Sequence, residues 1–483
     1  MSVALIAWLT IEMILRIAAL FVVPRNRKPT AGLAWMLVIF LMPIPGWIIF
    51  SVIGSYKLPP QRRDMQRTLD AYIEGTLHEI RHKKQIKVVD EVIPAKYQQA
   101  SILAQSLTHF PAFLGNKVEP IADYDKTISN IIKDIDQASH YIYIEYYILA
   151  LDETTERLFE SLKRAISRGV KVRVMYDAYG SRKYKRFSEM KRLLDDLGVE
   201  HHPMLPLTLP GRGYMRPDLR NHRKLVVVDG AIGYTGSLNM IARSYHRSDS
   251  IVYDELTVRL SGPIVQQLRA VFLTDWFSET GKMLKDTGTA LEELVDRNYG
   301  ATSMQMIPSG PGYDDENNLK VFNAIFYDAR ESITIVNPYF VPDESLIVAL
   351  ISAARRGVRV RLINSEAIDQ RFVAHAQRSY YEEMFRAGVE VYLYEAPTLL
   401  HSKYILIDDD LSLVGSSNMD IRSFELNHEL TVMVYGVKDN AKLHRITEEY
   451  LEKSKQVNAK RWLSRPPRLQ LLDNLARLTS SLQ

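Results

Sequence analysis

The chain has 483 residues, a formal net charge of +4, 46% hydrophobic and 24% charged residues, and no cysteine. This length predicts two or three domains, and the composition is that of a folded protein and not of a disordered one. The lack of cysteine excludes disulfides, thiolate nucleophiles and cysteine-based zinc sites. The small positive charge does not by itself indicate a nucleic acid partner, although it suits a partner that carries phosphate.

The N-terminus contains two apolar blocks, at about residues 3–23 and 33–53. In the first block Glu12 and Arg16 stand four residues apart, so on a helix they share a face and are expected to pair. The second block has no charged residue. As one helix it would rise about 30 Å, which is enough to span a hydrocarbon core. We therefore predict a transmembrane helical hairpin over residues 1–56.

Two further features of these blocks bear on topology. Pro43 and Pro45 are expected to kink the second block or to break it into a re-entrant hairpin. If both blocks span the membrane, the N-terminus and everything after residue 57 lie on one side. The positive-inside rule then compares three basic residues with four, namely Arg25, Arg27 and Lys28 against Lys57, Arg62, Arg63 and Arg67. We expect a multi-pass protein with the remainder of the chain in the cytoplasm.

After a polar, helix-prone connector at residues 57–115, the chain repeats itself. Each half contains a strand-like run, an amphipathic helix that stops at a glycine, and an alternating strand: 141–147, 158–167, Gly169 and 170–174 in the first half, and 333–336, 346–354, Gly357 and 358–362 in the second. Alternating strands and helices predict an α/β fold. We expect two similar lobes, at residues 116–300 and 301–483, related by a pseudo-two-fold.

Two segments fall outside this repeat. From Gly198 to His222 is 24 residues, but from Gly388 to His401 only 13. The extra segment of the first half has an apolar tip followed by three arginines: Arg212, Arg216 and Arg220. It is typical either of a loop that enters a bilayer and holds headgroup phosphates or of an ordinary surface loop. At the C-terminus, a leucine-faced helix is expected to dock on the body of the protein; its leucines are Leu471, Leu472, Leu475, Leu478 and Leu482.

One constellation of residues occurs once in each half, offset by 179 residues at every position. The copies are His222-x-Lys224-x4-Asp229-x6-Gly236-Ser237-x-Asn239 and His401-x-Lys403-x4-Asp408-x6-Gly415-Ser416-x-Asn418. Residues two apart on a strand share a face, so each histidine projects together with its lysine. The lysines, serines and asparagines suit phosphate oxygens, and imidazole is the plausible nucleophile. A single copy could be a set of ordinary surface residues. Two complete copies at the same spacing are not explained in that way.

The two aspartates of this constellation are weaker candidates. Asp229 and Asp408 belong to the candidate catalytic set, but each follows a strand, where holding a turn is an equal alternative. Two histidines and two aspartates would be a possible zinc set if lysines did not stand beside them and repel a cation. We therefore expect no metal and no cofactor.

The duplicated pattern resembles the HKD signature of the phospholipase D superfamily. The surrounding residues resemble its bacterial cardiolipin synthase branch most, over nearly the whole chain. The residues that carry this likeness are Asn221-His222-Arg223-Lys224, Ile307-Pro308-Ser309-Gly310-Pro311, Asn337-Pro338-Tyr339-Phe340-Val341-Pro342, Leu400-His401-Ser402-Lys403 and the run from Gly415 to Phe424. The resemblance implies a bacterial inner-membrane enzyme that makes cardiolipin from phosphatidylglycerol and does not bind nucleic acid. The oligomeric state stays open.

The resemblance further implies a phosphatidyl-histidine intermediate, with His222 favoured as the nucleophile and His401 as the acid and base. Each imidazole also needs an acceptor on its second nitrogen. Glu255 and Glu429 match the downstream carboxylate of the family, at 33 and 28 residues after the two histidines.

Several alternatives remain open from the sequence. The same chemistry could serve water, phosphatidylethanolamine or serine as acceptor. A nuclease with these half-sites would need a basic groove and stacking aromatics, and would have no reason for a membrane hairpin. A catalytically dead membrane scaffold is disfavoured by the two intact motifs.

Overall fold

The computed structural model describes residues 2–25, 27–55, 57–68, 93–206, 215–245, 251–284 and 299–478. The chain forms two compact units. The first contains residues 1–59 together with 207–218, and the second contains residues 60–206 together with 219–483.

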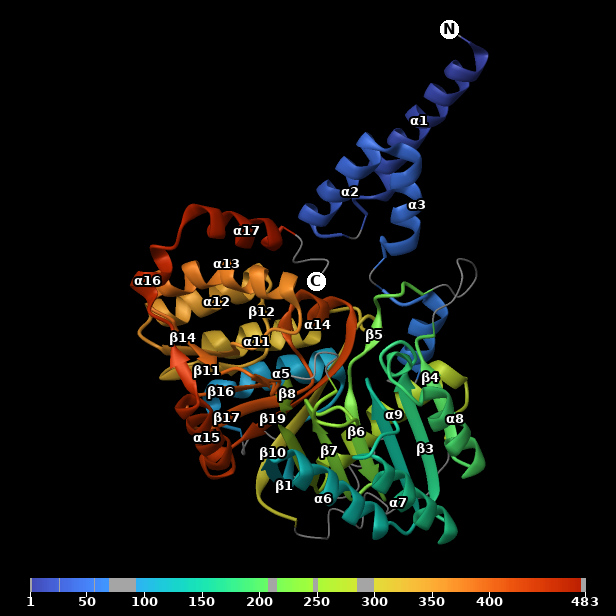
Figure 1. The fold of residues 1–483 in the computed structure, drawn as a ribbon, viewed down its shortest axis with the longest axis vertical. Coiled ribbons are helices and arrows are strands. Elements are labelled where there is room, and N and C mark those ends of the chain that lie inside the picture. Colours follow the sequence, from blue (N-terminus) through green and yellow to red (C-terminus); the bar gives the residue numbers. More distant parts are fainter. Residues whose placement is uncertain are drawn as a thin grey trace. The chain divides into compact units, whose positions relative to one another are not determined.

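The first unit contains three apolar helices, α1 (Val3–Val22), α2 (Pro29–Leu41) and α3 (Pro43–Ile53) (Figure 1). In the described part of the chain, α1 is the one helix that is long and apolar enough to cross a membrane. The predicted pairing of Glu12 and Arg16 is confirmed, with 3.1 Å between the carboxylate and guanidinium groups. The charges of this helix therefore neutralise each other on one face.

The second apolar block is broken into two helices. The break lies at Met42, whose φ of −136° and ψ of 77° are not helical, and Pro43 begins α3. Proline has no N–H to donate and its ring clashes with the preceding turn, so the predicted break is confirmed. Gly46 lets α3 pack tightly on α2, because a Cβ there would lie 2.9 Å from Cα of Ile39. At about 20 Å and 16 Å, neither helix reaches the 30 Å of a hydrocarbon core.

The second unit contains the two predicted α/β lobes. The strands of the first lobe are β1 (Phe113–Ile121), β2 (Tyr141–Tyr146), β3 (Lys171–Asp177), β4 (Glu200–Met204), β5 (Arg220–Asn221), β6 (Lys224–Val228), β7 (Ile232–Gly236), β8 (Val252–Asp254) and β9 (Thr257–Ser261). Those of the second lobe are β10 (Thr302–Ser309), β11 (Ser332–Val336), β12 (Phe340–Val341), β13 (Arg359–Ser365), β14 (Glu390–Tyr394), β15 (Thr398–Leu400), β16 (Tyr404–Ile407), β17 (Leu411–Gly415), β18 (Met419–Asp420), β19 (Asn427–Tyr435) and β20 (Ser454–Gln456).

The two lobes share one 16-stranded sheet over the residues that the structure describes. The first lobe has the order β4-β3-β2-β6-β7-β9-β1, and the second has β20-β14-β13-β11-β16-β17-β19-β10. In each lobe three neighbouring strands are parallel, β2, β3 and β4 in one and β11, β13 and β14 in the other. The antiparallel pairing of β1 with β10 joins the lobes. The predicted duplication is confirmed, but the duplicated sheets are continuous.

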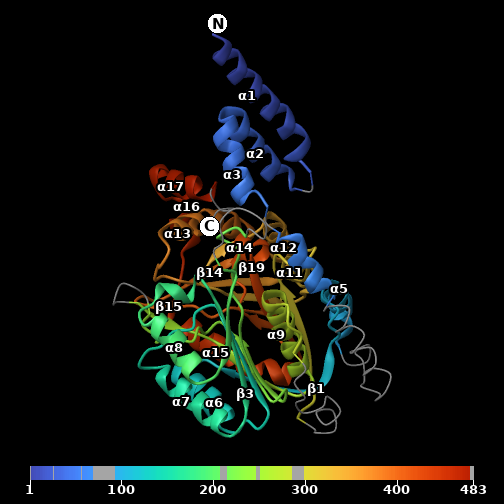
Figure 2. The same ribbon diagram turned by 90° about the vertical axis from the view of Figure 1, so that its right-hand side faces the viewer.

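Helices cover both faces of the sheet in the first lobe. Figure 2 shows α6 (Tyr124–Asp136), α7 (Glu156–Ser167) and α8 (Phe187–Asp196) on one side of the strands and α9 (Ile264–Thr280) on the other. The buried side of α7 packs Leu158 and Leu162 into the same core as Val174 of β3. The two faces are therefore closed by apolar packing, as the near-continuous apolar strands require.

In the second lobe the corresponding layer is α11 (Asn317–Asp328), α12 (Glu344–Arg355) and α13 (Arg371–Ala387), followed by α14 (Ile421–Glu425), α15 (Val437–Glu452), α16 (Ala459–Leu463) and α17 (Pro467–Arg477). The last part of the predicted connector is part of this lobe. A 3₁₀ turn, η1 (Ala95–Tyr97), and α5 (Gln98–Thr108) place Tyr97, Ala100 and Ala104 in its hydrophobic core. Residues 69–92 of the connector lie outside the described residues.

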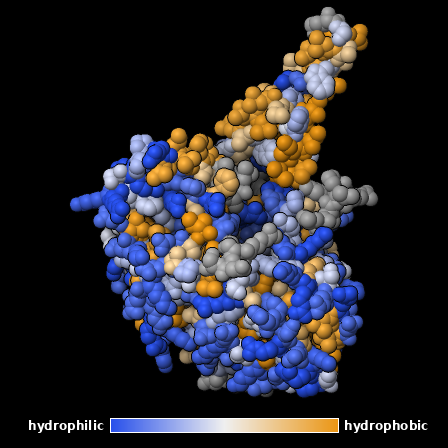
Figure 3. All heavy atoms as spheres, in the orientation of Figure 1, coloured by the Kyte–Doolittle hydropathy of each residue, from blue (hydrophilic) through white to orange (hydrophobic). Residues whose placement is uncertain are grey.

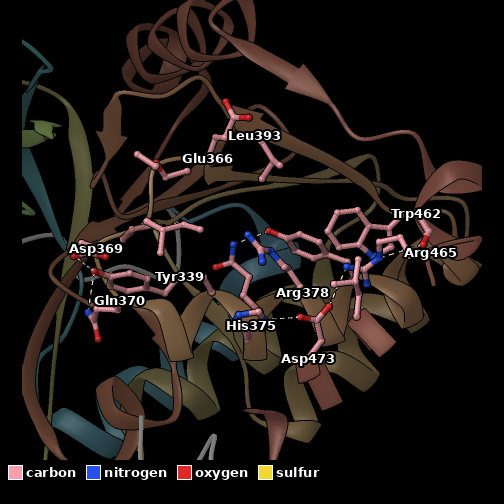
Figure 4. Close-up of a pocket in the computed structure, with 18 residues that line it drawn as sticks. Tyr339, Glu366, Asp369, Gln370, His375, Arg378, Leu393, Trp462, Arg465 and Asp473 are labelled. Carbon is pink, nitrogen blue, oxygen red and sulfur yellow. Dashed lines mark hydrogen bonds and ion pairs between the residues drawn. The ribbon is translucent and has the colours of Figure 1, made fainter. Parts of the chain in front are cut away.

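The C-terminal helix α17 docks on α13, as predicted, but with its polar side. Asp473 accepts from Nδ1 of His375 at 2.9 Å and pairs with Arg465, and both contacts are drawn in Figure 4 at the edge of a cavity of about 300 Å³. The exposed side carries four leucines with 52–79% of their surface exposed: Leu471, Leu472, Leu475 and Leu478. Figure 3 shows hydrophobic residues on this outer side of the helix. The helix therefore presents an apolar stripe to its surroundings.

Candidate active site

Two short strand pairings between the lobes place the histidines. β5 of the first lobe pairs in parallel with the start of β19, and β15 of the second lobe pairs in parallel with β8. The N–H of His222 then donates to the carbonyl of His428 at 2.9 Å, and the N–H of His401 donates to the carbonyl of Asp254 at 2.8 Å. Each histidine is thus anchored beside the residue that precedes a glutamate of the opposite lobe.

The predicted orienting glutamates bind the histidines in a crossed arrangement. Nδ1 of His222 lies 2.9 Å and 3.1 Å from the carboxylate oxygens of Glu429. Nδ1 of His401 lies 2.8 Å from Oε1 of Glu255. The unequal sequence spacing of the glutamates from the histidines of their own halves does not bear on this pairing, since each glutamate serves the histidine of the other half.

Two lysines complete the centre. Nζ of Lys224 donates to the carbonyl of His222, and Nζ of Lys403 donates to that of His401, each at 2.7 Å. Both lysines are almost fully buried, and burial lowers the pKa of Lys224 to about 7 and that of Lys403 to about 8. The cationic groups act on one another across the lobes, because Lys224, Lys403 and His401 all depress the pKa of His222. Such a cluster of cationic groups suits a bound anion, because the negative charge of the anion offsets their mutual repulsion.

The protonation of the imidazoles follows from this burial. Loss of solvation lowers the pKa of His222 well below its ordinary value and also lowers the pKa of His401. Burial raises the pKa of Glu429 to about 7. When an ionised glutamate faces Nδ1, that nitrogen carries the proton of a neutral imidazole. Nε2 is then left with its lone pair, the state that a nucleophile needs.

The two glutamates are held differently. Glu429 accepts from the hydroxyls of Ser416 at 2.5 Å and Ser423 at 2.8 Å. Ser423 is placed by the short helix α14, whose N-terminus is capped by Asp420. Oε2 of Glu255 is buried and has no hydrogen-bond partner. The first half has Ile241 where Asp420 stands, so it lacks this cap.

The predicted phosphate ligands divide into two kinds. The serine hydroxyls are occupied, because Ser416 binds Glu429 and Ser237 accepts from the N–H of Leu256 at 2.9 Å. The structure therefore gives these serines a supporting position in place of the predicted direct one. For the asparagines, Oδ1 of Asn239 and of Asn418 is buried without a hydrogen-bond partner. An amide oxygen only accepts, so a phosphate oxygen would have to be bound by the amide N–H groups of these side chains.

The two aspartates lie at the opposite ends of their strands, about 20 Å or more from the histidines at the rise of a strand. Asp229 accepts from the N–H groups of residues 139–141 at 2.8–2.9 Å. Asp408 accepts from those of residues 330–332 and pairs with Lys96 at 2.7 Å. Both residues have a positive φ. This corrects their placement in the catalytic set, because they tie a turn to the neighbouring strand.

The three arginines of the inserted segment lie in different parts of the protein. Arg212 lies outside the described residues. Arg216 belongs to the first unit, where it pairs with Asp218 and donates to the carbonyl of Ser55 at 3.1 Å. Arg220 is not a loop residue, because it lies on β5 with 4% of its surface exposed and contacts Asp177 at 3.3 Å. Its assignment to a membrane loop is therefore wrong.

Two tyrosines were missed by sequence reasoning. The ring of Tyr147 meets the ring of His222 edge-on at 5.0 Å, and Tyr253 meets His401 in the same way at 5.4 Å. Each tyrosine packs against its imidazole and limits the rotation of that ring. A tyrosine beside a strand looks the same in sequence whether it packs in a core or against a catalytic ring. Among the described residues, no three histidine, aspartate or glutamate side chains form a candidate metal site.

A family model described as "Cardiolipin synthase, PLD-like domain" matches residues 131–276 and 324–451. Cardiolipin synthase A of Serratia proteamaculans is 32% identical over 446 residues, covering 92% of this chain and 90% of its own. Cardiolipin synthase of Geobacillus kaustophilus is 32% identical over 471 residues, covering 96% and 91%. A phosphatidylserine synthase structure from Haemophilus influenzae has the same fold, with a TM-score of 0.60 at 15% identity, covering 80% of this chain and 100% of that one. The chain belongs to the cardiolipin synthase family of phospholipase-D-like proteins, which confirms the resemblance.

Proposed function

We propose that this enzyme is a cardiolipin synthase, which transfers the phosphatidyl group of one phosphatidylglycerol to a second and releases glycerol. The observation that carries the proposal is the crossed centre. Two imidazoles, each fixed on a glutamate of the opposite lobe, flank two buried lysines. One phosphodiester would neutralise part of this positive charge and place phosphorus between the two rings.

The first step forms a covalent intermediate. Nε2 of one histidine attacks phosphorus and forms a P–N bond while the P–O bond to glycerol breaks. The other histidine, protonated on Nε2 at the moment of attack, gives its proton to the departing glycerol oxygen. Lys224 and Lys403 stabilise the non-bridging oxygens as charge builds on them.

The second step reverses the roles of bond making and breaking. A headgroup hydroxyl of the second phosphatidylglycerol attacks phosphorus and forms a new P–O bond. Its proton passes to the second histidine, and the P–N bond breaks. The products are cardiolipin and a free nucleophilic histidine, and no external oxidant, nucleotide or metal enters the balance.

We assign the nucleophile to His222 and the acid and base to His401. The hydroxyls of Ser416 and Ser423 hold Glu429, so His222 has the more firmly placed ring. Burial and the charges of Lys224 and Lys403 favour its neutral form. Burial lowers the pKa of His401, but the charge of Glu255 partly offsets this effect, so His401 takes up the proton that it donates more readily than His222 does.

We also propose that the protein resides in the bacterial inner membrane with its lobes in the cytoplasm. α1 would cross the bilayer once, while α2 and α3 enter and leave as a re-entrant hairpin, since neither is long enough to span it. This topology puts all seven basic residues that flank α2 and α3 on one side of the membrane, which the positive-inside rule makes cytoplasmic. The exposed leucines of α17 suit the interface of the same membrane.

The test is product analysis with the full-length protein in vesicles of phosphatidylglycerol. We expect equal amounts of glycerol and cardiolipin without added nucleotide and in the presence of a chelator. Vesicles that also contain phosphatidylethanolamine, with serine in the buffer, test the other acceptors. Phosphatidic acid or a serine or ethanolamine lipid as the main product would contradict the proposal, and His222→Ala is the inactive control.

A further inference from the structure

Arg220 points to the same side of the extended backbone as His222. Asn221 donates to Glu145 at 3.0 Å, and the charge of Arg223 acts on the same glutamate. β5 ends at Asn221, but the N–H of His222 continues its pairing with β19, so the extended backbone turns Arg220 and His222 to the other side from Asn221. Arg220 is therefore the next side chain along the face that carries the reaction centre.

The guanidinium of Arg220 has unused donors. Its Nε and Nη2 are buried without a hydrogen-bond partner, and among the described residues no other arginine has two such nitrogens. Arg223 shows the contrast, since its Nε and Nη2 reach the carbonyls of Glu429 and Ser309 and its Nη1 binds Asp275. A buried donor without a partner is costly, so such an arginine is expected where a ligand supplies the acceptor.

The contact of Arg220 with Asp177 uses only one end of the guanidinium. Arg220 supplies a countercharge to the fully buried carboxylate of Asp177, which also accepts from the N–H groups of Tyr179, Gly180 and Asn221 at 2.7–2.9 Å. The arginine contact is the longest of the set, at 3.3 Å. The ion pair fixes one end of the guanidinium and leaves the other end available.

Arg220 also lies close to the centre. Its charge acts on Tyr147, whose ring contacts His222 and lies 5.5 Å from Nζ of Lys224. The duplicated motif does not repeat this residue. The equivalent position of the second half is Leu399, which is buried in an apolar cluster with Ile251 and Tyr253. The cation at this position is therefore present in the first half only, beside Arg422 of the second half, whose charge also acts on Tyr147.

We propose that Arg220 forms a second phosphate-binding subsite, which holds the phosphodiester of the acceptor lipid while its headgroup hydroxyl attacks the phosphatidyl-histidine. This inference rests on the proposed function and extends it, because it explains why the acceptor is itself a phospholipid. A donor phosphodiester needs only the His-Lys centre. An acceptor brings a second phosphate, joined to the attacking hydroxyl by a three-carbon glycerol.

The spacing on the strand suits this role. Arg220 and His222 are two residues apart, which a strand spaces by roughly 7 Å, similar to the reach of an extended glycerol bridge between two phosphates. Nε and Nη2 form one edge of the planar guanidinium, the edge that binds two oxygens of a phosphate at once. Because both nitrogens are enclosed, lipid entry must move the side chains that cover them, and the resulting ion pair would be shielded from water.

The experiment separates the two half-reactions in vesicles of phosphatidylglycerol. Exchange of labelled glycerol into phosphatidylglycerol needs one phosphodiester in the site, whereas cardiolipin formation needs two. We expect Arg220→Gln to lower cardiolipin formation by about 10- to 100-fold, the loss of one or two charge-assisted hydrogen bonds, and to leave glycerol exchange within about twofold. Arg220→Lys keeps the charge without the two-pronged geometry and should be intermediate.

Arg173→Gln is the matched control, since Arg173 is a buried arginine of the same lobe that pairs with Glu200. It should change both activities equally. If Arg220→Gln lost both activities equally, Arg220 would have a structural role and the proposed subsite would be wrong. This conclusion would hold whether Arg220→Lys restored both activities or lost both. Absence of both activities in the unaltered protein would instead contradict the proposed function, so the two failures are distinguishable.

Discussion

The two half-sites have the same motif at the same spacing, yet the protein surrounds them differently. In one, Glu429 receives two serine hydroxyls and holds His222; in the other, Glu255 has one free buried oxygen and holds His401. The difference arises in the segment after the motif, where the second half forms α14 and the described residues 242–245 of the first half form no helix. Duplication thus supplies two imidazoles with the same motif, and the segments that follow hold their two glutamates differently. Acid-base exchange at one phosphorus needs two unequal environments of this kind.

The strongest test of this comparison is removal of each imidazole. His222→Ala and His401→Ala should each lower cardiolipin formation by about 1,000-fold or more, because nucleophile and acid act as one unit. Only His401→Ala should retain slow formation of a phosphohistidine, detected by acid-quenched labelling with lipid carrying radioactive phosphorus. Trapping of label on the His222→Ala protein would reverse the assignment.

Removal of an orienting glutamate should lower kcat by less than removal of a histidine. Removal of a serine should lower it by less again. Glu429→Gln and Glu255→Gln should each lower kcat by about 10- to 100-fold, as for other groups that orient a catalytic ligand. Ser416→Ala should lower kcat by less than either, and the corresponding Ser237→Ala by less still, since Ser237 binds backbone and not a glutamate. If Ser237→Ala lowered kcat more than Ser416→Ala, the different support of the two glutamates would not explain the difference between the half-sites.

The pH dependence sharpens the same contrast. With its pKa raised to about 7, Glu429 is protonated at lower pH and cannot accept from His222, so kcat/KM should fall as pH drops below 7. With their pKa values lowered to about 7 and about 8, Lys224 and Lys403 lose their charges at higher pH, so kcat/KM should also fall as pH rises through this range. A bell-shaped profile of the free enzyme is expected. Glu429→Gln should flatten its acidic side, whereas Glu255→Gln should keep it.

The motif aspartates should affect stability and not chemistry. Asp408→Ala leaves three backbone N–H groups without their acceptor and leaves Lys96 only its pairing with Asp410. We expect a loss of about 1–3 kcal/mol in the free energy of unfolding and a kcat within about threefold for the folded fraction. Thermal unfolding together with active-site titration would measure both. A stable Asp408→Ala protein with a kcat lowered 100-fold would return this residue to the catalytic set.

The smallest effect is expected on the outside of α17. The absence of cysteine allows a single fluorophore at Leu472→Cys, with Ser167→Cys on the exposed end of α7 as the matched control. In vesicles, a quencher carried on lipid chains should act on the first label and aqueous iodide on the second. The pair Leu471→Glu and Leu475→Glu should lower vesicle activity several-fold. Iodide quenching of both labels alike would exclude contact of α17 with the membrane.

Much of the fold was predictable because it depends on local patterns in the sequence. Alternating apolar residues predicted the strands, and glycines such as Gly169 and Gly357 predicted the ends of the helices. Pro43 predicted the break in the second apolar block. The repeated His-x-Lys spacing placed both side chains on one strand face by geometry alone. These inferences need only near neighbours in the chain.

Other features depend on partners far away in sequence and were decided by tertiary structure. Glu429 stands 207 residues from His222, and only the pairing of β5 with β19 brings them together. The sequence predicted Arg220 in a loop, whereas the structure buries it on β5. It also predicted a leucine-faced helix docked on the body, whereas Asp473 of α17 contacts the body and the leucines are exposed. The sequence by itself identified the duplicated histidines and lysines and the two glutamates of the candidate site. Which groups meet, and how each is protonated, follows from burial and from contacts between the lobes, which no local pattern encodes.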